Sequence, residues 1–339
     1  MYKIACIFGN VPVYWDSIVM VLAELTGILL FFAAYLRKEE KVFGADIACP
    51  VSIMLSLILS RVAHWFFRPD SYGSFAMAMT DFFGPGHALM GAFAGCFLAA
   101  CLLRLIGTIE SLPRMLDCMS FGGCAAIALG RLSNLFTPDD RGTILQGIES
   151  FPWTYPAVNP TSGALEYRFA TFLFQAITAG CIFAVLMALL YNRNKKFKCR
   201  DGDMTLLFLL MYCASQIVWD STRYDTLRLR SNGFISAVQL ACALTLMAVL
   251  VILSIRAGAV YKTTQILRWF LIALAFGGAG GMEYLAQIRG DRAALAHGIM
   301  GGCMAVAVAV GFAMCRQIQE GSGNKSAPKY KGKYSGKYS

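Results

Sequence analysis

The chain has 339 residues, of which 57% are hydrophobic and only 15% are charged. Apolar runs of about 20 residues recur along most of it, and a helix of that length spans ~30 Å of hydrocarbon. This composition excludes a water-soluble globular protein. Because each crossing segment must satisfy its own backbone hydrogen bonds in lipid, the sequence predicts an all-α fold, a polytopic bundle of transmembrane helices.

The net charge of +10 sits largely in a few connecting segments and the C-terminal tail. This is the pattern of topology signals, and no aromatic-interleaved basic patch indicates nucleic-acid binding. The 12 cysteines lie singly in apolar runs without a Cys-x-x-Cys pair, so we interpret them as small packing residues. We expect no removable signal peptide, no metal and no cofactor, and no nucleotide motif is present.

Hydrophobic periodicity predicts about nine spans. They cover residues 17–36, 43–67, 84–107, 115–136, 169–191, 204–223, 233–255, 265–286 and 293–315. Residues 137–168 are rich in Pro, Gly and aromatic residues, which predicts a non-helical cap at the membrane interface. Residues 319–339 repeat a Gly-Lys-Tyr-Ser unit, which predicts a disordered basic tail that touches anionic lipid.

Basic charge alternates between the connecting segments. The basic segments are 37–42, 192–203, 256–262 and the tail. The positive-inside rule places these in the cytoplasm, with the N-terminus outside and the C-terminus inside. The loop 223–230 then faces outward, yet it carries Arg223, Arg228 and Arg230. One interpretation is that the other basic loops set the topology and these charges have no function. The other is that the cluster binds an anion such as a lipid phosphate.

The most informative stretch begins at Gly130, near the end of the fourth span. Arg131 lies within this apolar span, and Asn134 follows one helical turn later on the same face. A guanidinium at membrane depth costs at least ~2.5–3.5 kcal/mol on insertion scales, so an arginine there predicts a functional site. The alternative is an arginine that only anchors the helix end at the interface.

Polar residues gather at the outer ends of five consecutive spans. They are Arg61, His87, Arg131 with Asn134, Glu166, and the sixth-span residues Tyr212, Gln216, Asp220 and Arg223. The sixth-span residues follow helical spacing and share one face. The plainer explanations are an aromatic belt for the nearby His64, a satisfied ion pair for Asp220 and Arg223, and close helix contact for the glycines at 84, 86, 91 and 95. The convergence of the polar residues nevertheless predicts one site at the outer membrane surface.

These motifs, in this order, resemble the prolipoprotein diacylglyceryl transferases of bacterial inner membranes. The family signature is Gly-Arg-x-x-Asn followed by an acidic residue and a glycine, and it is matched by Gly130, Arg131, Asn134, Asp139 and Gly142. The stretch 212–225 is similar to the family's Tyr-Gly-x-x-Arg-x-x-x-Glu-x-x-Arg-x-Asp. The resemblance predicts a seven-span transferase-like domain over residues 1–255, an additional two-span hairpin over 256–318, and the tail.

Two positions depart from the family pattern. The family's arginine in the sixth span is Gln216 here, and we expect Arg223 to supply that charge by folding back along the helix. The family's His-Gly-Gly motif becomes Gly86-His87-Ala88, which displaces the histidine by one position.

The resemblance implies an enzyme that transfers the diacylglyceryl group of phosphatidylglycerol to the lipobox cysteine of a prolipoprotein. Its partners would be phosphatidylglycerol, prolipoprotein signal peptides and membrane lipids. Arg131, Arg61 and Arg223 would hold the phosphate, and His87 would be the base. Asn134, Asp139 and Asp220 would complete the catalytic group, and the residues expected to bind substrate are Arg61, Gly142, Glu166, Tyr212 and Gln216. The alternatives are a lipid-binding or lipid-moving protein that lacks the chemistry, and an assembly scaffold.

Overall fold

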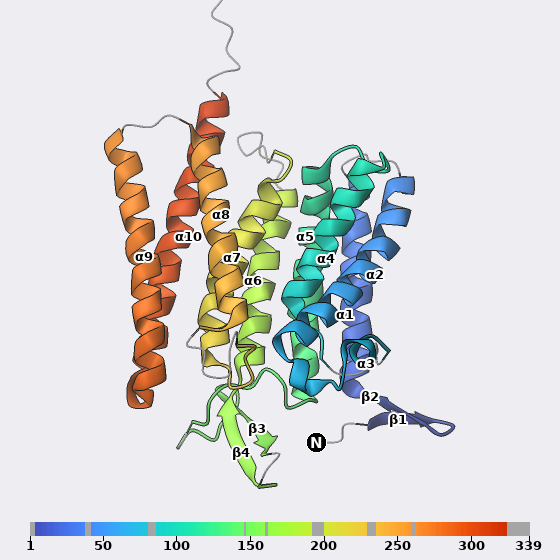
Figure 1. The fold of residues 1–339 in the computed structure, drawn as a ribbon. Helices are drawn as coiled ribbons and strands as arrows, with labels where there is room; N and C mark the ends of the chain where they lie inside the picture. The colour runs from blue at the N-terminus through green and yellow to red at the C-terminus, as the bar shows by residue number, and fades with distance from the viewer. Residues whose placement is uncertain are drawn as a thin grey trace, which may run out of the picture.

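The computed structural model describes residues 4–37, 42–80, 86–145, 147–159, 162–191, 200–228, 235–258 and 262–323. Across these ranges, eight helices are long and apolar enough to cross a membrane, and α4 is a shorter apolar helix beside them (Figure 1). They are α1 (Trp15–Arg37), α2 (Val42–Phe67), α4 (Leu89–Leu105), α5 (Leu112–Gly130), α6 (Thr171–Tyr191), α7 (Asp203–Thr222), α8 (Ala237–Ala257), α9 (Lys262–Ile288) and α10 (Ala293–Gly323). The predicted all-α polytopic bundle is confirmed.

Most helix boundaries differ from the sequence prediction by a few residues, and three of them bear on the site or the tail. α4 begins at Leu89 and residues 86–88 before it are not helical, whereas residue 84, where the predicted span starts, lies outside the described residues. α5 ends at Gly130, so Arg131 opens a 3₁₀ turn, Arg131–Leu135, instead of lying inside the α-helix. α10 runs on to Gly323, so residues 319–323 are helical, and the rest of the expected tail lies outside the described residues.

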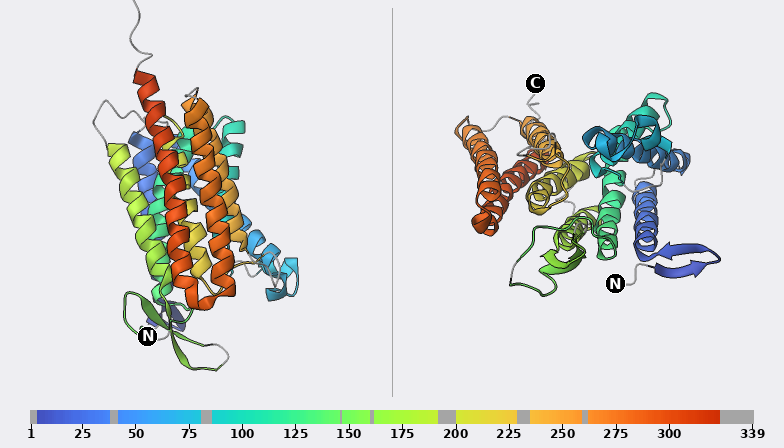
Figure 2. Two further views of the ribbon diagram at one scale, coloured as in Figure 1. Left: turned by 90° about the vertical axis from the view of Figure 1, so that its left-hand side faces the viewer. Right: turned by 60° about the horizontal axis from the view of Figure 1, so that its bottom comes forward.

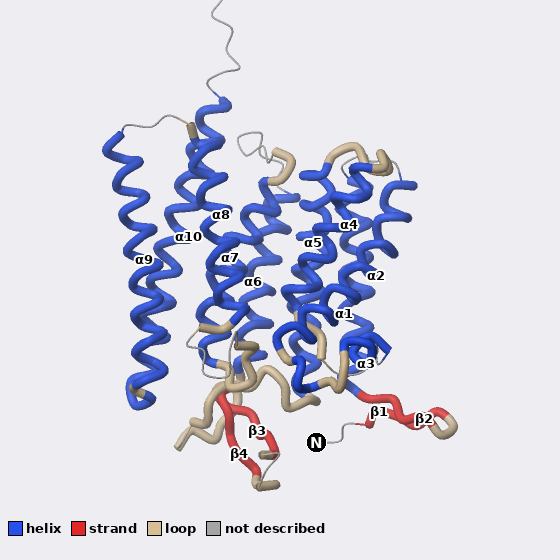
Figure 3. The backbone as a smooth tube through the Cα atoms, viewed as in Figure 1, coloured by secondary structure: helices blue, strands red, loops and turns tan. Residues whose placement is uncertain are grey.

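Two β-hairpins extend from one end of the bundle (Figure 3). One pairs β1 (Ile4–Phe8) with β2 (Val11–Tyr14), and the other pairs β3 (Thr154–Val158) with β4 (Leu165–Phe169). Apart from Phe169, the second hairpin lies within residues 137–168, which the sequence predicted to be non-helical. The short helix α3 (Phe75–Thr80) lies at the same end (Figure 1).

This end of the bundle, where α2, α5 and α7 finish and α6 and α8 begin, is called the site end below (Figure 1). β1 lies at the site end, and α10 finishes at the opposite end (Figure 1). The two ends of the described chain lie at opposite ends of the bundle because the chain crosses it an odd number of times. Which end faces the outside remains a prediction from the charge pattern.

Close helix pairs depend on glycine. A β-carbon on Gly95 would lie 2.5 Å from the Leu55 carbonyl oxygen, and one on Gly91 would lie 2.6 Å from the Ser60 α-carbon. The backbones of α2 and α4 therefore touch, as at small-residue contacts between membrane helices. This contact holds the start of α4 against the end of α2, where two of the predicted polar residues lie.

A buried carboxylate at the opposite end fixes α7 against α5. Asp117 of α5 accepts hydrogen bonds from the backbone N–H groups of Gly202 and Thr205, each at 2.9 Å. A negative charge is favourable at the N-terminus of a helix such as α7. Asp117 therefore sets the relative height of the two helices whose other ends form the site.

The last two helices form a hairpin against the rest of the bundle (Figure 2). α9 packs along α10, and α10 contacts both α7 and α8. On α10, a β-carbon at Gly311 would lie 2.6 Å from Cδ2 of Leu210, so α10 and α7 are in direct contact there. The hairpin is thus an integral part of the described bundle.

Candidate active site

Two arginines from different helices meet at one carboxylate at the site end. Arg131, the first residue after α5, forms an ion pair with Asp140. Arg223 follows α7, and its Nη2 lies 2.6 Å from Oδ1 of Asp140. Asn134 donates from Nδ2 to Oδ2 of the same carboxylate at 2.6 Å. Asp140 therefore joins the end of α5 to the end of α7.

The backbone at Asp140 has an unusual conformation. Its φ is +54°, in the left-handed region that non-glycine residues rarely adopt. Its N–H donates to Oδ2 of Asp225 at 3.1 Å, and its carbonyl accepts from the N–H of Phe172 at 3.2 Å. Burial alone would raise the pKa of Asp140, but the guanidiniums of Arg131 and Arg223 lower it below 3.8. Asp140 is thus held as a buried anion in a strained conformation, which is typical of functional sites.

Arg223 has three acidic partners. Besides Asp140, its Nε lies 2.9 Å from Oδ1 of Asp225, and its Nη1 lies 3.6 Å from Oδ1 of Asp220. Ser236, at the start of α8, donates to the other oxygen of Asp220. α7 ends at Thr222, and the backbone of Arg223 is extended; its side chain reaches back along the helix to Asp220, one turn away.

The position expected to receive the Arg223 charge is filled by a neutral pair. Gln175 of α6 donates from Nε2 to Oε1 of Gln216 at 3.1 Å, and both side chains are buried. Tyr212 lies one turn away on α7, also buried and close to the Arg131 guanidinium. In this structure Arg223 contacts Asp140, Asp225 and Asp220 rather than Gln216, so its guanidinium does not occupy the expected position.

The neighbouring Arg141 has a different environment. It is 1% exposed, and its guanidinium lies 4.5 Å from the Tyr155 ring centre and 4.4 Å from that of Phe172. Its Nη2 donates to the carbonyls of Asn134 and Thr137 at 2.7 and 2.8 Å. Arg141 thus supports the loop that carries Asp140, with its charge shielded by aromatic faces.

Gly142 is a packing residue in this structure. A β-carbon there would lie 2.7 Å from Cβ of Phe169 and 2.8 Å from Oγ1 of Thr171. Its N–H donates to the Phe169 carbonyl at 2.8 Å, and it forms an antiparallel bridge with Arg223. Only glycine lets these chain segments approach so closely, which in turn brings Asp140 and Arg223 together.

A second group of polar residues forms where α2 meets the start of α4. Nδ1 of His87 lies 2.7 Å from Oγ of Ser60. Arg61 is fully buried and donates to the carbonyls of Ala78 and Gly86, at 2.9 and 3.0 Å. Arg61 therefore holds the loop that carries His87, rather than joining Arg131 at Asp140.

Arg68, which the sequence analysis did not single out, connects the two groups. It follows α2, and its Nη2 donates to the backbone carbonyls of Asp225 and Thr226 at 2.9 and 3.3 Å. Asp225 in turn binds the Asp140 backbone and Arg223. The group around His87 and the group around Asp140 are therefore held at fixed relative positions. Arg230 of the expected outward arginine cluster lies outside the described residues.

Two predicted acidic residues lie apart from the arginine pair. Glu166, on β4, accepts from Nδ2 of Asn159 at 2.5 Å and pairs with Nη2 of Arg168 at 2.6 Å. The Asn159 hydrogen bond is the main cause of its lowered pKa. Asp139 is exposed, and the adjacent Asp140 is the residue that the two arginines contact. The motif spacing pointed to Asp139; the acidic pair in the sequence was the only sign of Asp140.

The chemistry of this arrangement is that of anion recognition. Guanidiniums bind carboxylates and phosphates through the same planar set of donors, so a phosphate can share or replace the Asp140 contacts. Among the residues that the structure describes, no group of three or more His, Cys, Asp and Glu side chains is arranged to hold a metal ion.

A family model described as prolipoprotein diacylglyceryl transferase matches residues 3–255, which include every residue of both groups. The chain belongs to this family. It is therefore a transferase and a multi-pass membrane protein. This member of the prolipoprotein diacylglyceryl transferase family has two further helices, α9 and α10, which lie beyond the matched region.

Curated relatives share the family name at low identity. The chain is 26% identical over 236 residues to a phosphatidylglycerol–prolipoprotein diacylglyceryl transferase of Clostridioides difficile, covering 68% of this chain and 86% of that protein. It is 24% identical to the enzyme of that name from Trichormus variabilis, over 65% of this chain and 78% of the relative. For the Limosilactobacillus reuteri enzyme the identity is 25%, over 73% and 88% respectively.

Proposed function

We propose that this protein transfers the diacylglyceryl group of phosphatidylglycerol to the lipobox cysteine thiol of prolipoproteins. The observation that carries the proposal is the pair of arginines, Arg131 and Arg223, held on either side of Asp140 within the family-matched region. The names of the curated relatives support both substrates. The reaction takes place at the outer leaflet of a bacterial inner membrane.

The reaction exchanges a carbon–oxygen bond for a carbon–sulfur bond. A base removes the thiol proton, because the thiolate is the nucleophile. The thiolate sulfur attacks the carbon of the diacylglyceryl group that is bonded to the phosphate oxygen, and a thioether forms. The carbon–oxygen bond to the phosphate breaks, and glycerol phosphate leaves with the bonding electron pair.

The arginine pair binds the phosphate and stabilises the charge that grows on the leaving group. Arg131 and Arg223 are the binding residues, and Asn134 and Asp140 orient them. Asp140 takes the orienting role that the family motif suggested for Asp139. Arg61 contributes indirectly, by holding the loop of His87.

His87 is the base in this proposal. Its Nδ1 lies 2.7 Å from Oγ of Ser60, which fixes the orientation of the imidazole ring that takes the thiol proton. Asp220 and Tyr212, both on α7, lie next to Arg223 and Arg131 respectively. Glu166 supports the β3–β4 hairpin beside the site.

Complementation of a bacterial strain depleted of its own transferase tests the function. The wild-type chain is expected to restore growth and thioether formation, and Arg131→Ala to abolish both while still inserting into the membrane. Arg131→Lys should recover little, because a point charge does not replace a two-pronged donor. We expect at least a roughly 100-fold loss for Arg131→Ala, as for removal of one transition-state donor. Full activity of Arg131→Ala would refute the assignment.

One observation favours a second candidate. The family's sixth-span arginine is replaced by the neutral Gln175–Gln216 pair, so the protein has one cation fewer at that depth. A lipid-binding or lipid-moving relative that has lost the chemistry would have this change. Saturable phosphatidylglycerol binding without thioether formation in the purified wild type would favour this candidate over the transferase.

A further inference from the structure

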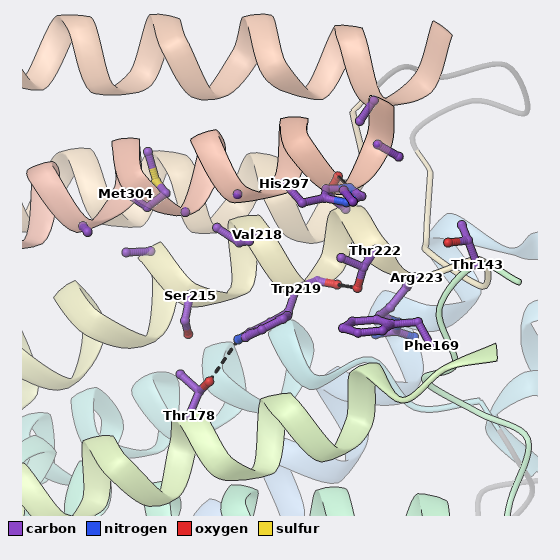
Figure 4. A pocket seen from close by; sticks show the side chains of 18 of the residues that line it. Thr143, Phe169, Thr178, Ser215, Val218, Trp219, Thr222, Arg223, His297 and Met304 are labelled. Atoms are coloured by element: carbon purple, nitrogen blue, oxygen red, sulfur yellow. Dashed lines mark hydrogen bonds between the residues drawn. The ribbon is translucent and has the colours of Figure 1, made fainter. Parts of the chain in front are cut away.

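A groove with a volume of about 1520 Å³ lies between α6, α7 and α10 (Figure 4). α6 and α10 form its two walls, and α7 forms its floor with Ser215, Val218 and Trp219. Nε1 of Trp219 donates to Oγ1 of Thr178 at 3.0 Å, which links the floor to the α6 wall. The lining is mainly apolar, as expected for a surface that faces lipid chains.

The wall on α10 lies outside the family-matched residues. It is built from small residues at helical spacing, including Gly298, Gly301 and Ala305. A β-carbon at Gly298 or Gly301 would meet no atom within 4 Å, so the space in front of them is open. The additional hairpin therefore converts one side of α7 into a groove.

Buried polar contacts hold this wall in place near the site. Glu283 of α9 accepts from Nε2 of Gln239 at 2.9 Å, and Gln239 belongs to the capping box of Ser236, which binds Asp220. Nε2 of His297 on α10 lies 3.0 Å from Oγ of Ser221 on α7. In a membrane such contacts meet little competition from water, so they fix the register of the hairpin against α7 and α8.

The length of the groove identifies the kind of occupant. On α7 its lining runs from Met211 to the helix end at Thr222, and a rise of 1.5 Å per residue makes this roughly 17 Å. That is close to half of a ~30 Å hydrocarbon core, or one leaflet. Beyond the lining residues Met211 and Val308, α7 and α10 come into contact where Leu210 meets Gly311. A spanning signal-peptide helix needs the full thickness, whereas acyl chains need one leaflet.

The mouth of the groove supplies the matching charge. Arg223 and Arg228 line it at the site end, where the headgroup of a lipid whose chains fill the groove would lie. We propose that this groove binds the acyl chains of the phospholipid donor, and that the α10 wall limits their length. The identity of the lipid as the donor rests on the proposed function; binding of the chains does not.

Trp219 supplies a readout that needs no catalysis. The purified full-length protein in detergent is titrated with phosphatidylglycerol brominated on its acyl chains, and the quenching lost in Trp219→Phe is assigned to Trp219. Gly301→Leu places a side chain in the groove. Gly302→Leu is the matched control, because Gly302 is also unobstructed but does not line the groove.

For palmitoyl-length chains, Gly301→Leu is expected to raise the half-saturating lipid concentration about tenfold, as for two methylene groups excluded from the groove. For octanoyl chains, Gly301→Leu should change the half-saturating concentration by no more than about twofold. Gly302→Leu should change it by no more than about twofold for either lipid. Ala305→Leu alters the same wall and replaces Gly301→Leu if that variant does not accumulate.

Equal responses of Gly301→Leu and Gly302→Leu, or no quenching assigned to Trp219, would overturn the proposal. So would quenching by a brominated signal peptide but not by lipid, which would assign the groove to the peptide helix. If the wild type transfers no diacylglyceryl group but is quenched in the expected pattern, the proposed function fails while the groove still binds acyl chains.

Discussion

Asp140 determines how the arginines of the site are arranged. It is contacted by Arg131, Asn134 and Arg223, and its left-handed backbone is held by Asp225. Each guanidinium would be a costly isolated charge near the membrane, and the shared carboxylate offsets part of that cost. The same sharing keeps both arginines oriented toward one point before a phosphate arrives.

The two adjacent aspartates have different roles. Asp140→Asn removes the anion between Arg131 and Arg223, and breaking a buried pair of this kind destabilises by about 3–5 kcal/mol. We expect a lower thermal midpoint and at least a roughly 10–100-fold loss of thioether formation, as for a lost charged hydrogen bond. Asp139→Asn, at an exposed position, should remain within about twofold of wild type by both measurements. A larger loss of thioether formation in Asp139→Asn than in Asp140→Asn would show that Asp139 orients the arginines.

Arg223 should matter as much as Arg131, because both hold the same carboxylate. Arg223→Ala is expected to reduce thioether formation by at least about 100-fold. Gln216→Arg alone should be tolerated, since the Asp220 carboxylate lies one turn away and can pair with a second guanidinium. The double variant should stay inactive, because Arg223 acts at Asp140 and not at position 216. Restored activity in the double variant, measured in the same assay, would contradict this account.

At the scale of elements, glycine contacts position the helices that carry the site. α1 and α5 meet at Gly27 and Gly122, and a β-carbon on Gly122 would lie 3.0 Å from Cβ of Phe31 and overlap the Gly27 carbonyl. This contact places α1 against the helix that ends at Arg131. The next residue, Gly123, faces open space.

These adjacent glycines allow a matched test of helix packing. Gly122→Leu should separate α1 from α5 and destabilise the protein by roughly 1–3 kcal/mol or more, as overpacking does. Gly123→Leu should be neutral or slightly stabilising, because leucine has the higher helix propensity. Thermal unfolding of both variants in one detergent compares them directly. Equal midpoints would show that the backbone contact is dispensable.

At the scale of the whole molecule, the polar residues of five spans lie toward one end of the bundle (Figure 1). Basic residues at the other end form more exposed ion pairs than those of the site. Arg114 pairs there with Asp201, and Arg256 pairs with Asp203. The two ends thus differ in chemistry. The additional hairpin follows the same polarity, with Glu283 and His297 at the site end.

The charge pattern predicts which end is outside. A reporter fused after Arg316 is expected to report the cytoplasm, and one inserted at the exposed turn near Gly147 to report the exterior. Paired alkaline phosphatase and fluorescent protein fusions make the measurement. The two sites reporting the same compartment would refute the orientation and with it the placement of the site in the outer leaflet.

The sequence by itself determined the membrane helices, the non-helical character of residues 137–168 and the family, because these depend on local hydrophobicity, turn residues and motif spacing. It also pointed to Arg131 and Asn134. Only the tertiary structure selected Asp140 over Asp139, since the two residues lie in a turn that buries one side chain and exposes the other. It also directed Arg223 away from Gln216, because α7 ends one residue earlier. The groove could not be read from the sequence, because α6 and α10 are more than 100 residues apart and meet only through packing on α7.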